Sequence, residues 1–476
     1  MEDSVARRRS AAALLALAAA TLVLAGVLWA GRQEEPQEAP GLAAEQTPNP
    51  LPVRGVFLNG QYYTVNTASL TLKGDAVTQG ELQQALGVLT QVERVTMPDT
   101  TLGYYEQRAL MREFPGIVFD WPVRIFGRQF NSLDQEISFA GQPGLDGYAI
   151  EQIRKRADAF YDLRSVDLTG CGLDSGELHA LDEDLGDTDV VFTFDLLGRE
   201  VCSTDEEIDL SGIVMKDRGA GVEEMLPWFT HLKKVVMCDC GISNEDMDAL
   251  NKKYEDIRFV WMVDIQWAAI RTDSDFFIPY RSSGVKQTRR RAGLKNLIYC
   301  TDLVALDIGH AHTQDISYIS VMPHLKYLIL AENYVVDISV LENLKELKWL
   351  EMFQCVTRDL SPLLGCTALE DLNICYMVAP RDNVFETLSQ MTWLKRLWCS
   401  GSTLTRDQVR RLREALPNTE IWCQMGDEST GSTWRYSESY YEMRDAFHMY
   451  YMDITGNRTR RLTPEELQKV HDRFWR

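Results

Sequence analysis

The sequence is poor in cysteine and in basic residues, and these shortages exclude two classes of protein. Ten cysteines are spread over 476 residues, too thinly for a fold held by disulfides, and no two form a C-x-x-C pair that would suggest zinc. The 49 basic residues are outnumbered by 70 acidic ones, which gives a net charge of −21. Phosphate binding needs a basic surface, so we expect no nucleic-acid partner.

The short motifs of the common catalytic sites are also missing. The chain contains no G-x-S-x-G, no H-E-x-x-H, no Walker-type loop and no G-x-G-x-x-G. His310 and His312 lie two residues apart, but only Asp307 is near enough in sequence to add a third metal ligand. We therefore predict no catalytic residues, no metal site and no cofactor.

The sequence does contain a short motif, called the D-I-S phrase below, that recurs every 22 residues. Asp-Ile-Ser or Asp-Leu-Ser begins at Asp315, Asp337 and Asp359. An L-x-x-L-x-L frame precedes each phrase, and the frames open at Leu303, Leu325, Leu347, Leu369 and, after a three-residue insertion, Leu394. This period and frame are the signature of a leucine-rich repeat. A coiled coil is excluded because its period is 7 and because Pro323 and Pro362 would interrupt a long helix.

The frame predicts an α/β solenoid with a curved parallel sheet. Its middle residues form a short strand whose fourth and sixth side chains point inward, and neighbouring repeats must stack to bury them. The ninth position normally carries Asn, whose amide can satisfy backbone groups in the following turn. Asn333 fills it in one repeat and Cys355 in the next, and Cys171 and Cys240 take the same place in earlier frames. We interpret these thiols as structural.

Residues 53–302 repeat on a longer scale, with a period near 70. Three lines match: V-E-R-V-T-M from Val92, L-R-S-V-D-L from Leu163 and L-K-K-V-V-M from Leu232. We predict three degenerate strand–helix repeats here, followed by leucine-rich repeats of 22–25 residues over 303–425. Each matched line leads into a helix and then an aromatic strand; the predicted helices are Glu106–Phe114, Glu177–Leu185 and Glu245–Tyr254, and the predicted strands are Ile117–Trp121, Val190–Phe194 and Ile257–Trp261.

The amino-terminal residues predict a membrane anchor. Residues 1–10 carry three arginines, residues 11–30 form an uncharged and mostly apolar run, and acidic residues follow it. That run is long enough to cross one bilayer as a helix, and the charge bias places the amino end inside the cell. A cleaved signal peptide is the alternative, although its apolar region is usually shorter. Residues 31–52 are rich in Pro and Glu and predict an extended linker.

Residues 426–476 break the repeat pattern and predict a helical C-terminal cap. Over Glu438–Tyr451, the side chains of Tyr440, Met443, Phe447 and Tyr450 fall on one helical face. A cap would cover the exposed end of the solenoid. A helix that docks on a partner is the alternative.

The concave sheet is the candidate binding face. Outward positions of four neighbouring frames carry aromatic side chains and a few acids, and exposed aromatic patches usually mark interaction sites. The predicted ligand-binding residues are Tyr327, Trp349, Glu351, Phe353, Tyr376 and Trp398. If the tail instead folds back over this face, these aromatic side chains belong to a core.

The D-I-S and L-x-x-L-x-L repeats from Leu303 to Leu394 resemble internalin-type leucine-rich repeats. The wider stretch from Val92 to Tyr451 looks like the leucine-rich repeat surface proteins of Gram-positive gut bacteria, through segments such as C-T-D-L-V-A-L-D-I-G-H (300–310), M-T-W-L-K-R-L-W (391–398) and Y-Y-E-M-R-D (440–445). The resemblance implies a curved binding scaffold outside the cell and implies no catalytic residues. The chain departs from internalins in lacking an L-P-x-T-G sorting signal.

These patterns together predict a non-catalytic, monomeric, membrane-anchored scaffold at the cell surface that binds a protein or a glycan. A cell-envelope hydrolase is one alternative, and two ionisable groups with shifted pKa values in one cleft would mark it. A purely structural envelope scaffold is another, and a concave face covered by its own tail would mark that.

Overall fold

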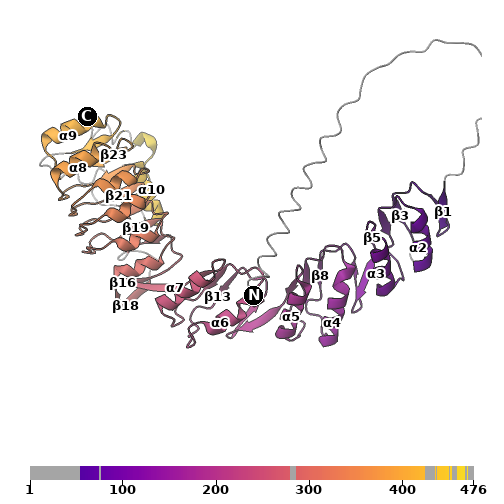
Figure 1. Cartoon of the computed structure of the whole chain (residues 1–476). Coiled ribbons are helices and arrows are strands. Elements are labelled where there is room, and N and C mark those ends of the chain that lie inside the picture. The colour runs from indigo at the N-terminus through magenta and orange to yellow at the C-terminus, as the bar shows by residue number, and fades with distance from the viewer. Residues whose placement is uncertain are drawn as a thin grey trace, which may run out of the picture.

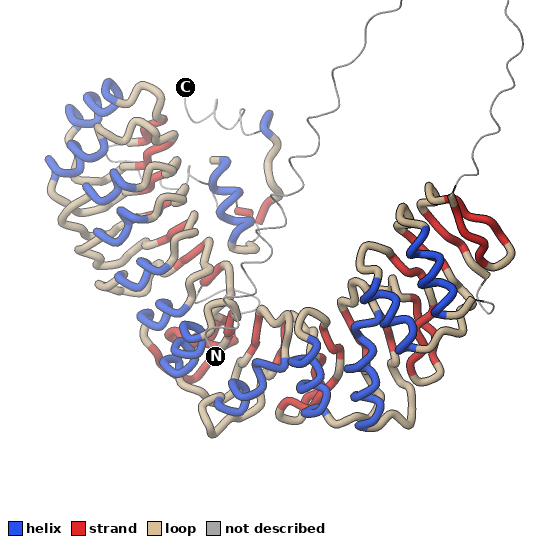
Figure 2. The backbone as a smooth tube through the Cα atoms, turned by 45° about the vertical axis from the view of Figure 1, so that its right-hand side comes forward, coloured by secondary structure: helices blue, strands red, loops and turns tan. Residues whose placement is uncertain are grey.

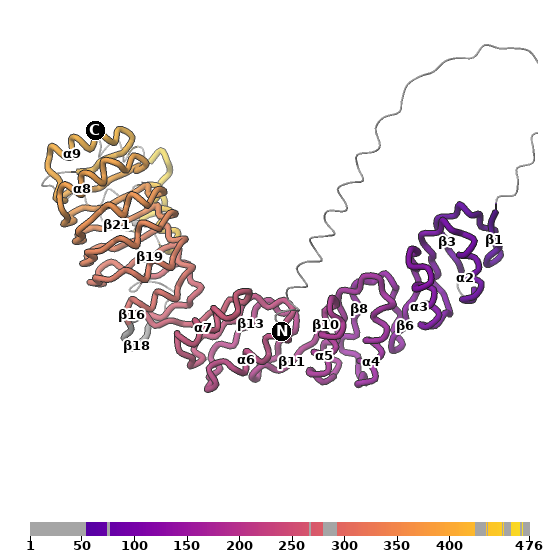
Figure 3. The backbone as a smooth tube through the Cα atoms, in the orientation of Figure 1, coloured from indigo at the N-terminus to yellow at the C-terminus, as the bar shows by residue number. Residues whose placement is uncertain are grey.

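The protein is an arc-shaped solenoid with strands along its inner side and helices along its outer side (Figure 1). The computed structural model describes residues 54–73, 77–278, 286–423, 435, 437–449, 451–452, 458–466 and 469. The chain runs in one direction along the arc, and the tail then turns back onto the inner side of the C-terminal half (Figure 3). The predicted α/β leucine-rich repeat solenoid is therefore confirmed.

The C-terminal half of the arc is built on one parallel sheet of seven strands, in the order β17-β19-β20-β21-β22-β23-β24. The strands are in register, so that Leu306, Leu328, Leu350 and Leu372 lie side by side, each fully buried. The strand bounds are β17 Phe276–Phe277, β19 Ala305–Asp307, β20 Tyr327–Ile329, β21 Trp349–Glu351, β22 Asp371–Asn373, β23 Arg396–Trp398 and β24 Glu420–Trp422.

The D-I-S phrases begin the outer side of each short repeat. The carboxylates of Asp315, Asp337 and Asp359 each accept a hydrogen bond at 2.9 Å from the backbone N–H two residues later. This Asx-type bond starts a turn. A short 3₁₀ helix follows each one: η5 Ser317–Val321, η6 Ser339–Asn343 and η7 Ser361–Gly365. In the fourth repeat, which opens at Leu369, the three-residue insertion makes room for an α-helix, α8 (Arg381–Leu388), in the equivalent place.

The ninth position of the frame holds neighbouring turns together, as predicted. The amide nitrogen of Asn333 donates to the carbonyl oxygens of Ile308 and Leu330, both at 2.8 Å, and its oxygen accepts from the Thr313 N–H at 2.9 Å. The thiol of Cys355 donates to the Leu330 carbonyl at 3.1 Å. Cys171 and Cys240 make the same bond to the preceding repeat, so these thiols replace the asparagine amide.

The N-terminal half consists of three parallel sheets of three strands each, with helices outside them (Figure 2). The sheets are β3 Ser69–Thr71, β4 Arg94–Thr96 and β5 Val118–Asp120; β8 Glu136–Ser138, β9 Ser165–Asp167 and β10 Asp189–Val191; β13 Glu207–Asp209, β14 Lys234–Val236 and β15 Arg258–Val260. The helices are α2 Gln79–Val88, α3 Tyr104–Glu113, α4 Gly147–Arg156, α5 Ser175–Leu185, α6 Ala220–Met225 and α7 Asn244–Lys253, with α9 Arg406–Ala415 near the other end of the arc. The three helices predicted from the long period are α3, α5 and α7, within two residues at each end.

Antiparallel strand pairs precede, separate and follow these sheets, and they were not predicted from the sequence. They are β1 Gly55–Leu58 with β2 Gln61–Thr64, β6 Pro122–Ile125 with β7 Arg128–Asn131, β11 Thr193–Leu196 with β12 Arg199–Cys202, and β16 Met262–Arg271 with β18 Lys286–Ala292. In the hairpins β6–β7 and β11–β12, both turn residues have positive φ: Phe126 and Gly127 in the first, Leu197 and Gly198 in the second. An X-Gly pair of this kind is the residue pattern of a two-residue hairpin turn.

One apolar core runs the length of the arc, and a second, separate cluster lies on the inner side of the seven-stranded sheet. The predicted anchor (11–30) and linker (31–52) lie outside the described residues. Within the part of the chain that the structure describes, no helix is long and apolar enough to cross a membrane.

The asparagine bridge gives a test of this packing. Replacing Asn333 with Ala removes all three hydrogen bonds: the Thr313 N–H loses its acceptor, and the Ile308 and Leu330 carbonyls keep only their longer bonds to the Ala311 N–H and the Cys355 thiol. The free energy of unfolding should fall by about 1–3 kcal/mol. Replacing it with Cys should cost less, because a thiol at this position can still donate to the carbonyl of the preceding repeat, Ile308, as Cys355 donates to Leu330. Urea unfolding compares the two variants. Equal losses would contradict the assigned role of the ninth position.

Candidate binding face on the concave sheet

The outward side chains of the seven-stranded sheet form two rows across the strands. The register pairs Ala305, Tyr327, Trp349, Asp371 and Arg396 in one row. The other row contains Asp307, Ile329, Glu351, Asn373 and Trp398. Both rows alternate with the buried leucines because the side-chain period of a strand is two residues. The predicted residues Tyr327, Trp349, Glu351 and Trp398 therefore do share one face.

That face is not open, and the expectation of an exposed aromatic surface is wrong for four of the six predicted residues. Tyr327 is 6% exposed, Trp349 and Trp398 are 1% exposed, and Glu351 is 9% exposed. The physical reason is the tail helix α10 (Glu438–Ala446), which lies on the inner side of the arc against β21. These side chains can contact an external ligand only if α10 leaves.

The contact between α10 and the sheet is largely aromatic. The rings of Trp349 and Trp398 lie 6.0 Å apart, and Tyr440 of α10 lies 6.4 Å from Trp349. Tyr441 packs edge-on to Tyr440 at 5.6 Å. Tyr440, Tyr441, Met443 and Phe447 are almost fully buried and join the cluster on the inner side, whose sheet-side members are Ile278, Ala305, Tyr327 and Trp349.

Polar groups also bridge the tail and the sheet. The hydroxyl of Tyr327 donates to a carboxylate oxygen of Glu442 at 3.1 Å, and the ammonium group of Lys348 lies 3.3 Å from the same oxygen. Burial and the neighbouring Glu442 carboxylate raise the pKa of the Tyr327 hydroxyl. Further along, His448 lies 3.8 Å from Asp275, beside β17. The tail thus crosses the sheet from β22 back to its first strand.

Two carboxyl groups are buried under the tail. Burial and the negative charge of Asp307 raise the pKa of Glu351 to about 8, and only Arg435, just ahead of α10, opposes this shift. Burial also raises the pKa of Asp371, although Arg396 lies 3.0 Å away and favours the charged form. Asp371, Lys348 and Glu442 carry no signal in the sequence, because their role depends on where the tail docks.

The remaining two predicted residues lie apart, at the rim of the sheet. Phe353 and Tyr376 follow their strands, are half-buried, and pack edge-on with ring centroids 5.6 Å apart. The Tyr376 ring lies directly over Gly401, where a Cβ would collide with it. Tyr376 and Gly401 both have positive φ, at the same position of consecutive frames. These two aromatic side chains border the covered face and remain accessible.

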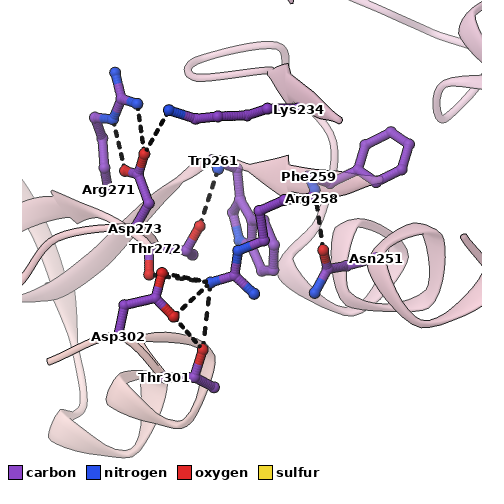
Figure 4. Close-up of polar contacts among 10 residues, drawn as sticks. All are labelled: Lys234, Asn251, Arg258, Phe259, Trp261, Arg271, Thr272, Asp273, Thr301 and Asp302. Atoms are coloured by element: carbon purple, nitrogen blue, oxygen red, sulfur yellow. Dashed lines mark hydrogen bonds and ion pairs between the residues drawn. The ribbon is translucent and has the colours of Figure 1, made fainter. Parts of the chain in front are cut away.

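A second polar cluster joins the two halves of the arc (Figure 4). Asp273 accepts from Arg271 at 2.7 Å and lies 3.1 Å from Lys234, while Arg258 lies 3.2 Å from Asp302. Burial alone would raise the pKa of Asp273, but its two cationic partners outweigh that effect and lower it. Since every charge here has a partner of opposite sign, the cluster is a structural junction.

Metal binding has no support among the described residues, where no group of three or more His, Cys, Asp and Glu side chains could hold an ion. The His310 ring lies 3.0 Å from Glu332, and the His312 ring stacks on Tyr334 at 6.1 Å. The two histidines therefore point to different partners.

No family model matches the chain, and no curated protein matches it. Solved structures with a similar trace include the internalin inlF of Listeria monocytogenes, at 13% identity and a TM-score of 0.26, over 77% of this chain and 86% of that one. A leucine-rich repeat protein of Leptospira interrogans, LIC12759, shares 13% identity at a TM-score of 0.26, and the match covers 71% of this chain and 91% of that one. Internalin C2 of Listeria monocytogenes shares 19% identity at a TM-score of 0.23, and the match covers 29% of this chain and 70% of that one. At these scores they carry no argument about function, and the leucine-rich repeat assignment rests on the chain's own 22-residue register.

Buried Glu351 predicts a pH-dependent stability. Because the folded protein raises the pKa of this carboxyl group to about 8, the group keeps its proton up to about that pH, whereas it ionises near its ordinary pKa of 4.5 when exposed. The folded state therefore binds more protons, and stability should fall as the pH rises from about 4.5 to about 8. Glu351→Gln should raise the melting temperature at pH 8 and change it little at pH 5.

The matched control is Glu386→Gln on the exposed side of α8, which should have no such effect. Thermal unfolding of the full chain at both pH values makes the comparison. A gain for Glu351→Gln that is equal at pH 5 and pH 8 would mean that the carboxyl group is not covered.

Proposed function

We propose that this protein is a non-catalytic, extracytoplasmic protein-binding scaffold, held at the membrane by residues 11–30, with the concave side of its seven-stranded sheet as the binding face. The apolar run and its flanking charges support the anchor and the location. The bulk of the chain would stand outside the cell on the Pro-rich linker.

The observation that carries the proposal is that this face already engages a polypeptide segment. Its aromatic rows pack on the side chains of α10, and Tyr327 and Lys348 contact the Glu442 carboxylate. Tyr and Trp in a desolvated centre, bordered by polar groups, are the usual composition of a protein-binding hot spot. This chemistry favours a protein ligand over a glycan.

The structural-scaffold alternative has one specific observation in its favour, namely that the tail covers the concave face. Against it stands the separation of the two apolar clusters: no residue of the cluster under α10 belongs to the core of the arc. The tail therefore adds a contact to the sheet without completing the core of the solenoid. This arrangement is expected for a segment that binds the sheet and not for a segment that the fold needs.

The hydrolase alternative receives less support. Glu351 and Asp371 lie on neighbouring strands and both have raised pKa values, which is the pattern that would mark an enzyme. Burial beneath α10 explains both upward pKa shifts, and the neighbouring Arg396 opposes the shift at Asp371. Both side chains are buried, with 9% of Glu351 and 1% of Asp371 exposed.

A site-specific photocrosslinker tests the proposal in intact cells that display the full chain. A crosslinking residue in place of Phe353, at the accessible rim of the face, should give discrete protein adducts. The same residue in place of Glu386, on the outer side of the arc, should give none. No adducts at Phe353, or the same adducts at both positions, would favour the purely structural scaffold.

A further inference from the structure

We propose that the face formed by β20, β21 and β22 is a docking site for a short aromatic helix of a partner protein, and that α10 is a resident occupant which this helix displaces. The inference rests on the proposed function and adds the kind of partner and its regulation. It follows from the position, the independence and the chemistry of the α10 contact.

The position of α10 is that of a ligand rather than of an end cap. A cap covers the last repeat of a solenoid, because that edge has no following neighbour. Here α10 packs on β21, in the middle of the sheet, and its partners Tyr327 and Trp349 belong to β20 and β21. The residues after α10 continue away from the C-terminal edge, toward Phe276 of β17, whose ring lies 5.0 Å from that of His448.

The sheet is complete beneath the tail. The inward residues Leu328, Leu350 and Leu372 are fully buried in the core of the arc and share no cluster with α10. Removal of α10 would expose Tyr327, Trp349 and Trp398 while leaving the core closed. An exposed aromatic face of this kind is a protein-interaction surface.

The α10 contact also defines what the partner must present. Its side chains at Tyr440, Tyr441, Met443 and Phe447 fill the apolar part of the face, and the Glu442 carboxylate meets Tyr327 and Lys348. A competing helix would therefore carry two or three aromatic residues and a methionine within two turns, with an acidic residue beside the aromatic pair. This corresponds to helix-in-groove recognition, in which affinity comes from a few anchors on one helical face.

The tail can exclude such a helix because it is part of the same chain. Residues 424–434 connect β24 to the tail and include two Gly, two Ser and two Thr residues. Tethering gives an occupant a high effective concentration, so a free helix binds with its affinity reduced by the fraction of molecules that are open. Weakening the tail should consequently strengthen binding in trans.

The test uses a fluorescent peptide of residues 435–451 and the full chain. The peptide should bind weakly to the wild-type chain and at least about tenfold more tightly to a Tyr440→Ala, Tyr441→Ala chain, whose own tail no longer competes. Fluorescence anisotropy measures both affinities. A peptide with the same two substitutions should bind neither chain.

A charge swap provides a second test, because it leaves every aromatic side chain of the tail and the sheet unchanged. Glu442→Lys should open the site through repulsion from Lys348 and strengthen binding of the wild-type peptide. Adding Lys348→Glu should restore the tail contact and weaken peptide binding again. Unchanged melting of the solenoid in these variants verifies that only the tail has moved.

Three outcomes would overturn the inference. Equal binding of the peptide to the wild-type and tail-weakened chains would mean that α10 does not occupy its site, and no binding to either would mean that the face takes no helix. Concentration-dependent dimerisation of the tail-weakened chain without peptide would assign the face to a second copy. If the Phe353 crosslinker still captures a protein in these cases, the proposed function survives and only the helix site fails.

Discussion

The structure depends on the alignment of one inward leucine per repeat across neighbouring parallel strands. Leu306, Leu328, Leu350 and Leu372 are in register and fully buried, so each repeat closes the apolar surface of the one before it. Full burial of a leucine side chain contributes about 1.5–3 kcal/mol. Once this row is set, the two-residue period of the strand decides which side chains face outward, and therefore what the concave face can bind.

The register determines which side chains line the concave face, and the tail determines whether they are exposed. Its outward rows combine Trp349 and Trp398 with Glu351 and Asp371, a set of side chains too apolar for solvent and too charged for a core. The tail resolves this conflict by covering the aromatic rings. It does so at the cost of burying two carboxyl groups, one of which keeps its proton to about pH 8. A contact that buries carboxyl groups together with aromatic rings is easier to release than a purely apolar core, because burying a polar group is unfavourable.

Most of the fold could be predicted because it is encoded locally. The 22-residue frame gave the strands of the C-terminal sheet, the Asp315, Asp337 and Asp359 turns, and the bridging roles of Asn333 and Cys355. The hairpins at Phe126-Gly127 and Leu197-Gly198 were missed, although an X-Gly pair between two short strands carries the signal. The docking of α10 could not be predicted in the same way. Its apolar face is visible in the sequence, but the partner of that face lies about 100 residues away and has no local signature.

The central claim is that α10 covers the concave sheet as a unit separate from the solenoid. Native-state hydrogen exchange on the full chain measures this directly, because it reports the opening free energy of each segment. The account predicts that the amides of α10 open with a clearly lower free energy than those of β20, β21 and β22. Exchange of α10 and these strands at one common free energy would contradict it, since the tail would then be part of the fold rather than an occupant of its face.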